Sequence, residues 1–189
     1  MYEVALFVFY FAVCAADLPV APPAPPRVYC SDIPAQILEC MGRPSITPID
    51  NLAKCTRSTT ACERLTCSFR QSGWLDGAQV DKVKVTEHFE RFARDAPEWS
   101  AAVQQIKTVC LAGELPAQGI FLNCPAYDIW HCAFSAFIKH AQPSQWFKSQ
   151  SCDYPRQYAA ACPVCPDECF APAIPVGSCN ACIVLPRTP

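Results

Sequence analysis

The chain has 189 residues, of which 15 are Cys, 19 are Pro and only 6 are Gly. Hydrophobic residues make up 51% of it and charged residues 17%, which excludes the low hydrophobicity and high net charge of a disordered chain. The formal net charge of −2 leaves no basic excess to neutralise phosphates, so nucleic acid is not an expected partner. The length predicts one domain, and the cysteine density favours a disulfide scaffold.

The chain begins with a segment typical of a secretory signal peptide. Residues 4–16 (VALFVFYFAVCAA) form an apolar run of thirteen, whereas a membrane-spanning helix needs about 20 residues. Small residues end the run, so residues 1–16 are predicted to be removed by cleavage after Ala15 or Ala16. The alternative is a buried N-terminal helix. Export predicts a secreted, extracellular chain without membrane insertion, in an environment where disulfides persist.

Cleavage would remove Cys14 and leave fourteen cysteines, an even number that permits complete pairing. Eight of them precede residue 150 and six follow it. The simplest partition is therefore four bridges in the first region and three in the second, although bridges between the two regions are equally permitted. The disulfide candidates are Cys30, Cys40, Cys55, Cys62, Cys67, Cys110, Cys124, Cys132, Cys152, Cys162, Cys165, Cys169, Cys179 and Cys182.

Residues 17–29 (DLPVAPPAPPRVY) carry five prolines and predict a stiff polyproline-II leader, with a ligand for a proline-recognising domain as the alternative. Residues 30–150 instead show helical periodicity, for example in Val85, Phe89 and Phe92, which stand at i, i+4 and i+7. Pro and Gly residues separate the predicted helices, which cover residues 32–39, 48–56, 60–69, 78–93, 98–110 and 125–140.

No strand pattern longer than four residues is present in this region, so the fold class is all-α. We expect a compact, disulfide-linked bundle of about six short helices in residues 30–150. Residues 151–189 differ, because they hold six Cys and seven Pro with little periodicity. They predict a loop-rich extension that bridges hold in shape.

Two C-x-x-C pairs in the extension, Cys162/Cys165 and Cys179/Cys182, have the spacing of a four-thiolate zinc site. An oxidising compartment favours disulfides over a metal there, so neither metal nor cofactor is expected. No G-x-S-x-G, H-E-x-x-H or Gly-rich phosphate loop is present, and the chain is not expected to be an enzyme. The three histidines, His88, His131 and His140, are far apart in the sequence and are expected to be exposed or hydrogen-bonded.

Aromatic residues are concentrated on the last three predicted helices. An ordinary core is one explanation, and an apolar cavity between helices, kept open by disulfides, is the functional alternative. The candidate lining residues are Val85, Phe89, Phe92, Trp99, Val103, Ile106, Tyr127, Trp130, Phe134, Phe137 and Ile138.

The spacing Cys62-x₄-Cys67-x₄₂-Cys110-x₁₃-Cys124-x₇-Cys132 resembles cysteines two to six of insect odorant-binding proteins. That family places three residues between the second and third cysteines and eight between the fifth and sixth. The additional cysteines and the Cys/Pro-rich extension resemble its atypical, cysteine-expanded branch. The resemblance implies a helical bundle around an apolar pocket that carries small hydrophobic molecules through extracellular fluid without catalysis, with a chemosensory receptor as a further candidate partner.

The resemblance also implies the bridges Cys62–Cys124 and Cys110–Cys132, and a partner for Cys67 among Cys30, Cys40 and Cys55. One extra residue between two cysteines of a helix rotates the second by about 100°. The helix at 60–69 must therefore either distort or present Cys62 and Cys67 differently from the family.

Two other functions stay open at this point. A disulfide-rich interaction module, such as a protease inhibitor, would expose a rigid loop in residues 170–178. A structural or cuticular protein would usually show sequence repeats, and none is visible. Within the carrier hypothesis, position alone makes His131 or His140 a candidate for pH-gated release.

Overall fold

The structure, a computed structural model, describes residues 28, 30, 32–42, 45–56, 60–162 and 164–183. The predicted signal peptide with Cys14, and the Pro-rich leader except for Val28, lie outside the described residues. The described part is an all-α fold linked by disulfides, as predicted. None of its helices is both long enough and apolar enough to span a membrane.

The helices in chain order are α1 (Ile37–Cys40), α2 (Ile49–Ala53), α3 (Ala61–Gln71), α4 (Lys82–Asp95), α5 (Ser100–Gln105), α6 (Pro125–His140), α7 (Asp153–Ala161) and α8 (Asn180–Ile183). Two two-residue strands, β1 (Leu75–Asp76) and β2 (Gln79–Val80), pair antiparallel between α3 and α4. The shorter helical turns are η1 (Pro97–Trp99), η2 (Ile106–Cys110), η3 (Pro143–Gln145), η4 (Gln150–Cys152) and η5 (Asp167–Phe170).

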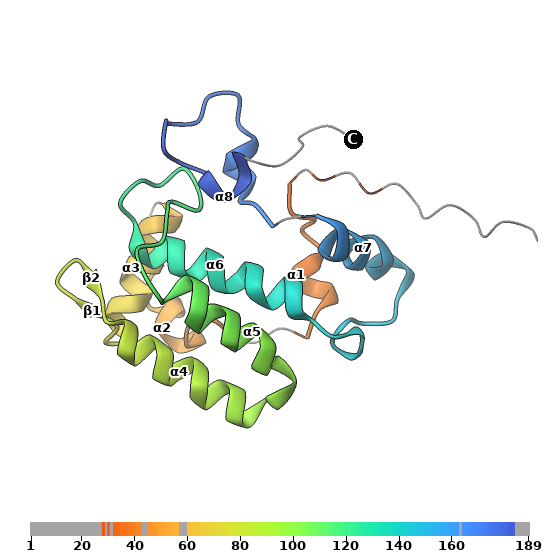
Figure 1. Ribbon diagram of the computed structural model, residues 1–189, viewed down its shortest axis with the longest axis horizontal. Coiled ribbons are helices and arrows are strands. Elements are labelled where there is room, and N and C mark those ends of the chain that lie inside the picture. The colour runs from red at the N-terminus through yellow and green to blue at the C-terminus, as the bar shows by residue number, and fades with distance from the viewer. Residues whose placement is uncertain are drawn as a thin grey trace, which may run out of the picture.

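Helix α6 is the centre of the fold, and Figure 1 shows it running through the middle of the molecule. Eleven of its sixteen residues are buried. Helices α3 and α5 pack against it, and α7 packs against both α6 and α1. The predicted helix 125–140 is confirmed, since Pro125 at the first position fixes its start. The apolar character of this helix on several faces suits a position that other helices cover.

The predicted helix 32–39 is helical only from residue 37 on, as α1, and the other helices differ from prediction mainly at their ends. Helix α3 begins at its Thr60 capping box, whereas α4 begins at Lys82 rather than 78, because Gln79 and Val80 pair with β1 before Asp81 caps the helix. The predicted helix 98–110 consists of three pieces, η1, α5 and η2. The last piece is a π-helical turn that ends at Cys110.

All fourteen predicted cysteines are paired. The structure differs from the simplest partition, because two bridges join the two regions, three lie before residue 150 and two lie after it. The pairs are Cys55–Cys67, Cys62–Cys124 and Cys110–Cys132 in the first region, Cys30–Cys162 and Cys40–Cys152 between the regions, and Cys165–Cys182 and Cys169–Cys179 in the second.

Three of these bridges are the ones that the family resemblance implies, with Cys55 as the partner of Cys67. Helix α3 is continuous from Ala61 to Gln71, so it does not distort to accept the longer spacing. Five residues correspond to about 140° around a helix, and Cys62 and Cys67 therefore face different partners. Cys62 joins α6, whereas Cys67 joins the end of α2.

The region after residue 150 begins with a helix that sequence analysis did not predict. Helix α7 contains Pro155 in its first turn, a position that a helix tolerates, and it buries Tyr158 and Ala159. Lys139 of α6 donates hydrogen bonds to the carbonyl oxygens of Ala159 and Cys162. Residues 151–162 thus belong to the helical body, and the loop-rich part described begins at residue 164.

Candidate binding cavity

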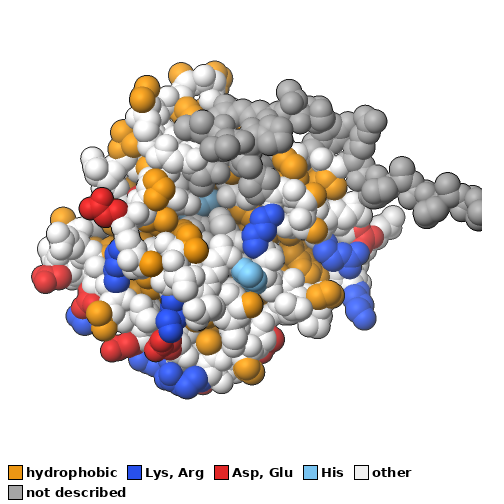
Figure 2. All heavy atoms as spheres, viewed as in Figure 1, with side chains coloured by type: hydrophobic (Ala, Val, Ile, Leu, Met, Phe, Trp, Pro, Cys, Tyr) orange, Lys and Arg blue, Asp and Glu red, His pale blue; other side chains and the backbone are white. Residues whose placement is uncertain are grey.

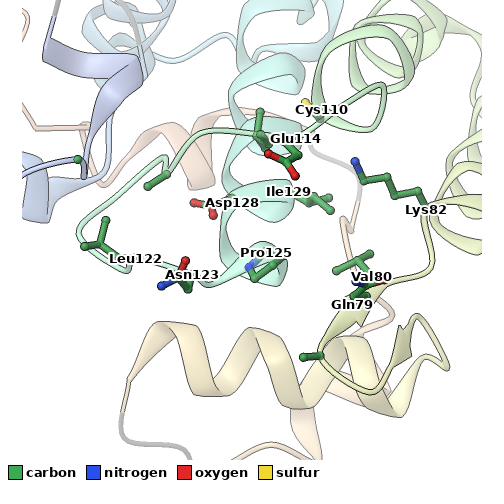
Figure 3. A pocket seen from close by; sticks show the side chains of 14 residues that line it. Gln79, Val80, Lys82, Cys110, Glu114, Leu122, Asn123, Pro125, Asp128 and Ile129 are labelled. Carbon is green, nitrogen blue, oxygen red and sulfur yellow. The ribbon is translucent and has the colours of Figure 1, made fainter.

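A cavity of about 740 Å³ opens at the end of the bundle where α6 begins (Figure 3). Its walls come from the β-hairpin, the first turn of α4, the segment 110–125, the first turn of α6 and one loop of the C-terminal region. The lining residues are Ala78, Gln79, Val80, Lys82, Cys110, Glu114, Leu115, Ala117, Leu122, Asn123, Pro125, Asp128, Ile129 and Gly177. This volume lies within the roughly 300–1,000 Å³ of small-molecule sites.

Local structure explains how the first walls are placed. Gly77 has φ 61°, and this left-handed conformation turns the chain between β1 and β2 so that Val80 reaches the cavity. Two disulfides, Cys110–Cys132 and Cys62–Cys124, fasten the two ends of the loop between η2 and α6. That loop supplies most of the lining, and covalent links at both ends limit its movement.

The C-terminal region forms another wall. The backbone N–H groups of Cys179 and Asn180 donate to the carbonyl oxygens of Gly119 (2.9 Å) and Ala117 (3.2 Å). Gly177, just before them, lines the cavity. Gly119 also permits close packing, because a Cβ atom there would lie 2.7 Å from the hydroxyl oxygen of Tyr127. The C-terminal region is therefore docked onto the loop that lines the cavity.

Asp128 is the buried charged group of the cavity, with 5% of its surface exposed. Its Oδ1 atom accepts a hydrogen bond of 2.8 Å from the backbone N–H of Gln118. Burial raises the pKa of Asp128 to about 6, and the Gln118 hydrogen bond opposes that shift. Lys82 donates to the carbonyl oxygen of Gly113, and Glu114 at the rim is exposed.

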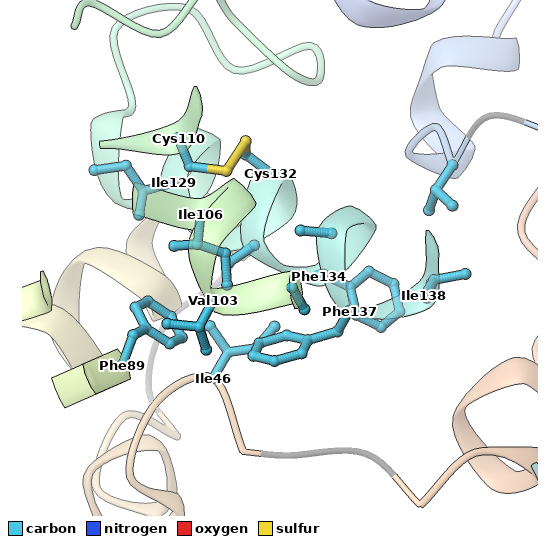
Figure 4. Close-up of a cluster of buried hydrophobic side chains, with 14 of the residues drawn as sticks. Ile46, Phe89, Val103, Ile106, Cys110, Ile129, Cys132, Phe134, Phe137 and Ile138 are labelled. Carbon is cyan, nitrogen blue, oxygen red and sulfur yellow. A yellow bond between two sulfur atoms is a disulfide. The ribbon is translucent and has the colours of Figure 1, made fainter. Parts of the chain in front are cut away.

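Most of the aromatic residues predicted to line a pocket pack together in one core (Figure 4). Phe137 lies at its centre, with ring centroids at 5.4 Å from Trp99, 5.8 Å from Phe92 and 6.1 Å from Phe89. The remaining candidates in this core, all buried, are Val85, Val103, Ile106, Phe134 and Ile138. None of these nine residues lines the cavity of Figure 3.

Three of the predicted residues do border other openings. Tyr127 and Trp130 line an apolar groove of about 670 Å³ between α2, α3 and α6, together with Ile49 and Leu52. Ile138 borders a smaller depression of about 210 Å³ beside α7. The groove contains more apolar surface than the cavity, but it lies open along the side of the bundle.

The histidines occupy three different environments. His131 is 4% exposed, neither ring nitrogen has a hydrogen-bond partner among the described residues, and burial lowers its pKa to about 4. His140 shares a hydrogen bond with the side chain of Gln105. His88 lies beside Trp74, and its pKa is lowered by burial and by the charge of Arg91. The expectation of an exposed or hydrogen-bonded side chain is wrong for His131.

Sequence analysis did not single out the cavity residues. Asp128 could have been recognised from the sequence, because it is the one acidic residue within the apolar segment 125–140. Leu115, Leu122 and Asn123 could not have been found in this way, because the loop that carries them has no periodicity. Its position depends on disulfides to residues that are distant in the sequence.

The cysteines of the possible zinc site are all committed to disulfides, which leaves no thiolate among them to bind a metal. Within the described residues no group of three or more His, Cys, Asp or Glu side chains is placed to hold a metal ion. No family model matches the sequence, and no curated protein sequence matches it.

Proposed function

We propose that this protein is a secreted carrier that binds small hydrophobic molecules of odorant, pheromone or lipid type. It transports them through extracellular fluid without changing them chemically. The observation that carries the proposal is the cavity at the start of α6, which combines apolar residues such as Val80 and Ile129 with a few polar groups. The seven disulfides fit an extracellular site of action.

The physical basis of binding is burial of apolar surface, at about 25 cal/mol per Å² before ordering costs are subtracted. Disulfides suit such a function, because they stabilise the fold without filling its cavity. A ligand of roughly ten to twenty heavy atoms should bind with micromolar affinity. On the face shown in Figure 2, acidic and basic side chains are interspersed with hydrophobic ones, which fits a protein that works free in fluid.

The test uses the disulfide-bonded mature chain and the neutral fluorescent probe N-phenyl-1-naphthylamine. We expect saturable binding and competition by a panel of odorants and fatty acids. Ala117→Trp, which fills the cavity, should abolish binding, whereas the matched control Ala53→Trp, which fills the apolar groove, should preserve it. Absence of saturable binding would reject the carrier, and loss in the control alone would move the site to the groove.

A second candidate, a protease inhibitor, has one observation in its favour. The disulfide Cys169–Cys179 closes a short loop, and Val176 at its tip is 98% exposed. Gly177 beside it has φ 89°, which fixes a tight turn. Inhibition of a serine protease by the full chain, lost on Val176→Asp, would favour this candidate over the carrier.

A further inference from the structure

Asp128 has one carboxylate oxygen with no partner among the described residues. Its Oδ1 atom accepts the backbone N–H of Gln118, and its other oxygen accepts no hydrogen bond from the described residues. That second oxygen is not among the buried side-chain atoms that lack a partner, so it is open to the cavity. The ion pairs among the described residues do not include Asp128 either. With only 5% of the residue exposed, this oxygen is the part of the carboxylate that is left to pair with a group in the cavity.

The contact with Gln118 accounts for one oxygen only. It anchors the loop 111–124 to the first turn of α6, where the helix dipole also favours a negative charge. An amide side chain would supply the same acceptor oxygen without the cost of a buried charge. The anchoring role alone therefore does not explain why the residue is a carboxylate.

Charged groups of both signs lie around the cavity. Burial raises the pKa of the neighbouring Tyr127, and the charges of Glu168, Asp128 and Asp167 add to that shift. Glu114 lines the same cavity. Lys82 is the cation of the lining, but it donates to the carbonyl oxygen of Gly113. Figure 3 shows Lys82 approaching from the side of α6 opposite to the loop that carries Leu122 and Asn123.

The lining also carries the apolar side chains of Val80, Leu115, Leu122 and Ile129, beside the polar ones of Gln79 and Asn123. From this combination we infer that the cavity selects a small ligand with a protonated amine, which pairs with the free oxygen of Asp128, and an apolar group, which packs on these side chains. The inference rests on the proposed carrier function and names the class of its ligand. A charge-assisted hydrogen bond of this kind is stronger than the neutral bond that an alcohol would make.

The experiment compares three probes of similar size by isothermal titration calorimetry on the disulfide-bonded mature chain at pH 7.5. They are 2-phenylethylamine (a cation), 2-phenylethanol (neutral) and phenylacetate (an anion). We expect the amine to bind roughly tenfold more tightly than the alcohol and the acid to bind most weakly. Asp128→Asn, which keeps an acceptor for Gln118, should weaken the amine roughly tenfold and change the alcohol by less than about threefold.

Glu114→Gln is the matched control, because it removes the same charge from an exposed position of the same cavity. It should change amine binding by less than about threefold, since exposed carboxylates are screened by solvent. Equal losses in the two variants, or an amine that binds no more tightly than the alcohol, overturn the inference while the carrier function stands. Failure of all three probes to bind overturns both.

A pH comparison of the unmodified chain gives a readout that does not depend on folding of a variant. Because the pKa of Asp128 is about 6, its carboxyl is largely protonated at pH 5, and the preference for amine over alcohol should shrink there. The alcohol is the control for the other titratable groups around the site, which are Lys82, Glu114, Tyr127, His131, Asp167 and Glu168. An unchanged preference at pH 5 contradicts the inference.

Discussion

Two disulfides, Cys30–Cys162 and Cys40–Cys152, join the start of the helical body to the two ends of α7, and their removal gives a quantitative test of the fold. Cys30 and Cys40 lie ten residues apart, and so do their partners Cys152 and Cys162. While one bridge is intact, the other therefore closes a loop of only about 20 residues. Chain entropy predicts that removing either bridge by paired Cys→Ala substitutions lowers the free energy of unfolding by about 3 kcal/mol.

Removing both bridges should lower the free energy of unfolding by more than twice the loss from one bridge. Residues 40 and 152 are then linked only through Cys62–Cys124, along a path of about 50 residues, so the second removal costs about 4 kcal/mol and the pair about 7 kcal/mol. Guanidinium unfolding of the oxidised proteins, followed by far-UV circular dichroism, measures these differences. A loss of less than about 1 kcal/mol for the double removal would refute the reasoning.

Three further substitutions test separate features. Burial lowers the pKa of His131 from 6.5 to about 4, so the stability that its neutral form contributes is complete above pH 6.5 and is lost as the pH falls through 4. Between pH 7 and pH 4 the free energy of unfolding should therefore fall by about 3 kcal/mol less in His131→Leu than in the original chain. Equal pH dependence of the two free energies would contradict this. Gly119→Ala should cost about 1–3 kcal/mol in chemical denaturation, because its Cβ would overlap the ring of Tyr127; a cost near zero would show that the ring can move aside. Thr60→Ala should cost about 1 kcal/mol by removing the capping box of α3, with Thr60→Ser as the control that keeps it.

The helical class could be predicted from local signals, whereas the two bridges Cys62–Cys124 and Cys110–Cys132 were implied by the family resemblance. Helix α6 has Pro125 at its first position and apolar residues throughout, so its bounds follow from the residues themselves. The pairing of Cys67 with Cys55 did not follow, since the resemblance admitted three partners.

Helix α7 and the position of the cavity were not predicted, for different physical reasons. Pro155 and the neighbouring cysteines make residues 151–162 resemble a loop, and their helix is supported by packing on α1 and α6. The aromatic residues carry a strong helical period, but a period identifies the buried face of a helix and not whether that face encloses a space. In this fold those side chains fill the core with one another.

The most direct test of the account is to locate a bound ligand by intermolecular nuclear Overhauser effects from 2-phenylethanol to the methyl groups of the mature, disulfide-bonded chain. A ligand bound in the cavity at the start of α6 should give contacts to the methyls of its lining residues Val80, Leu115, Leu122 and Ile129. Contacts confined to Val103, Ile106 or Ile138 in the core, or to Ile49 and Leu52 in the side groove, would contradict it.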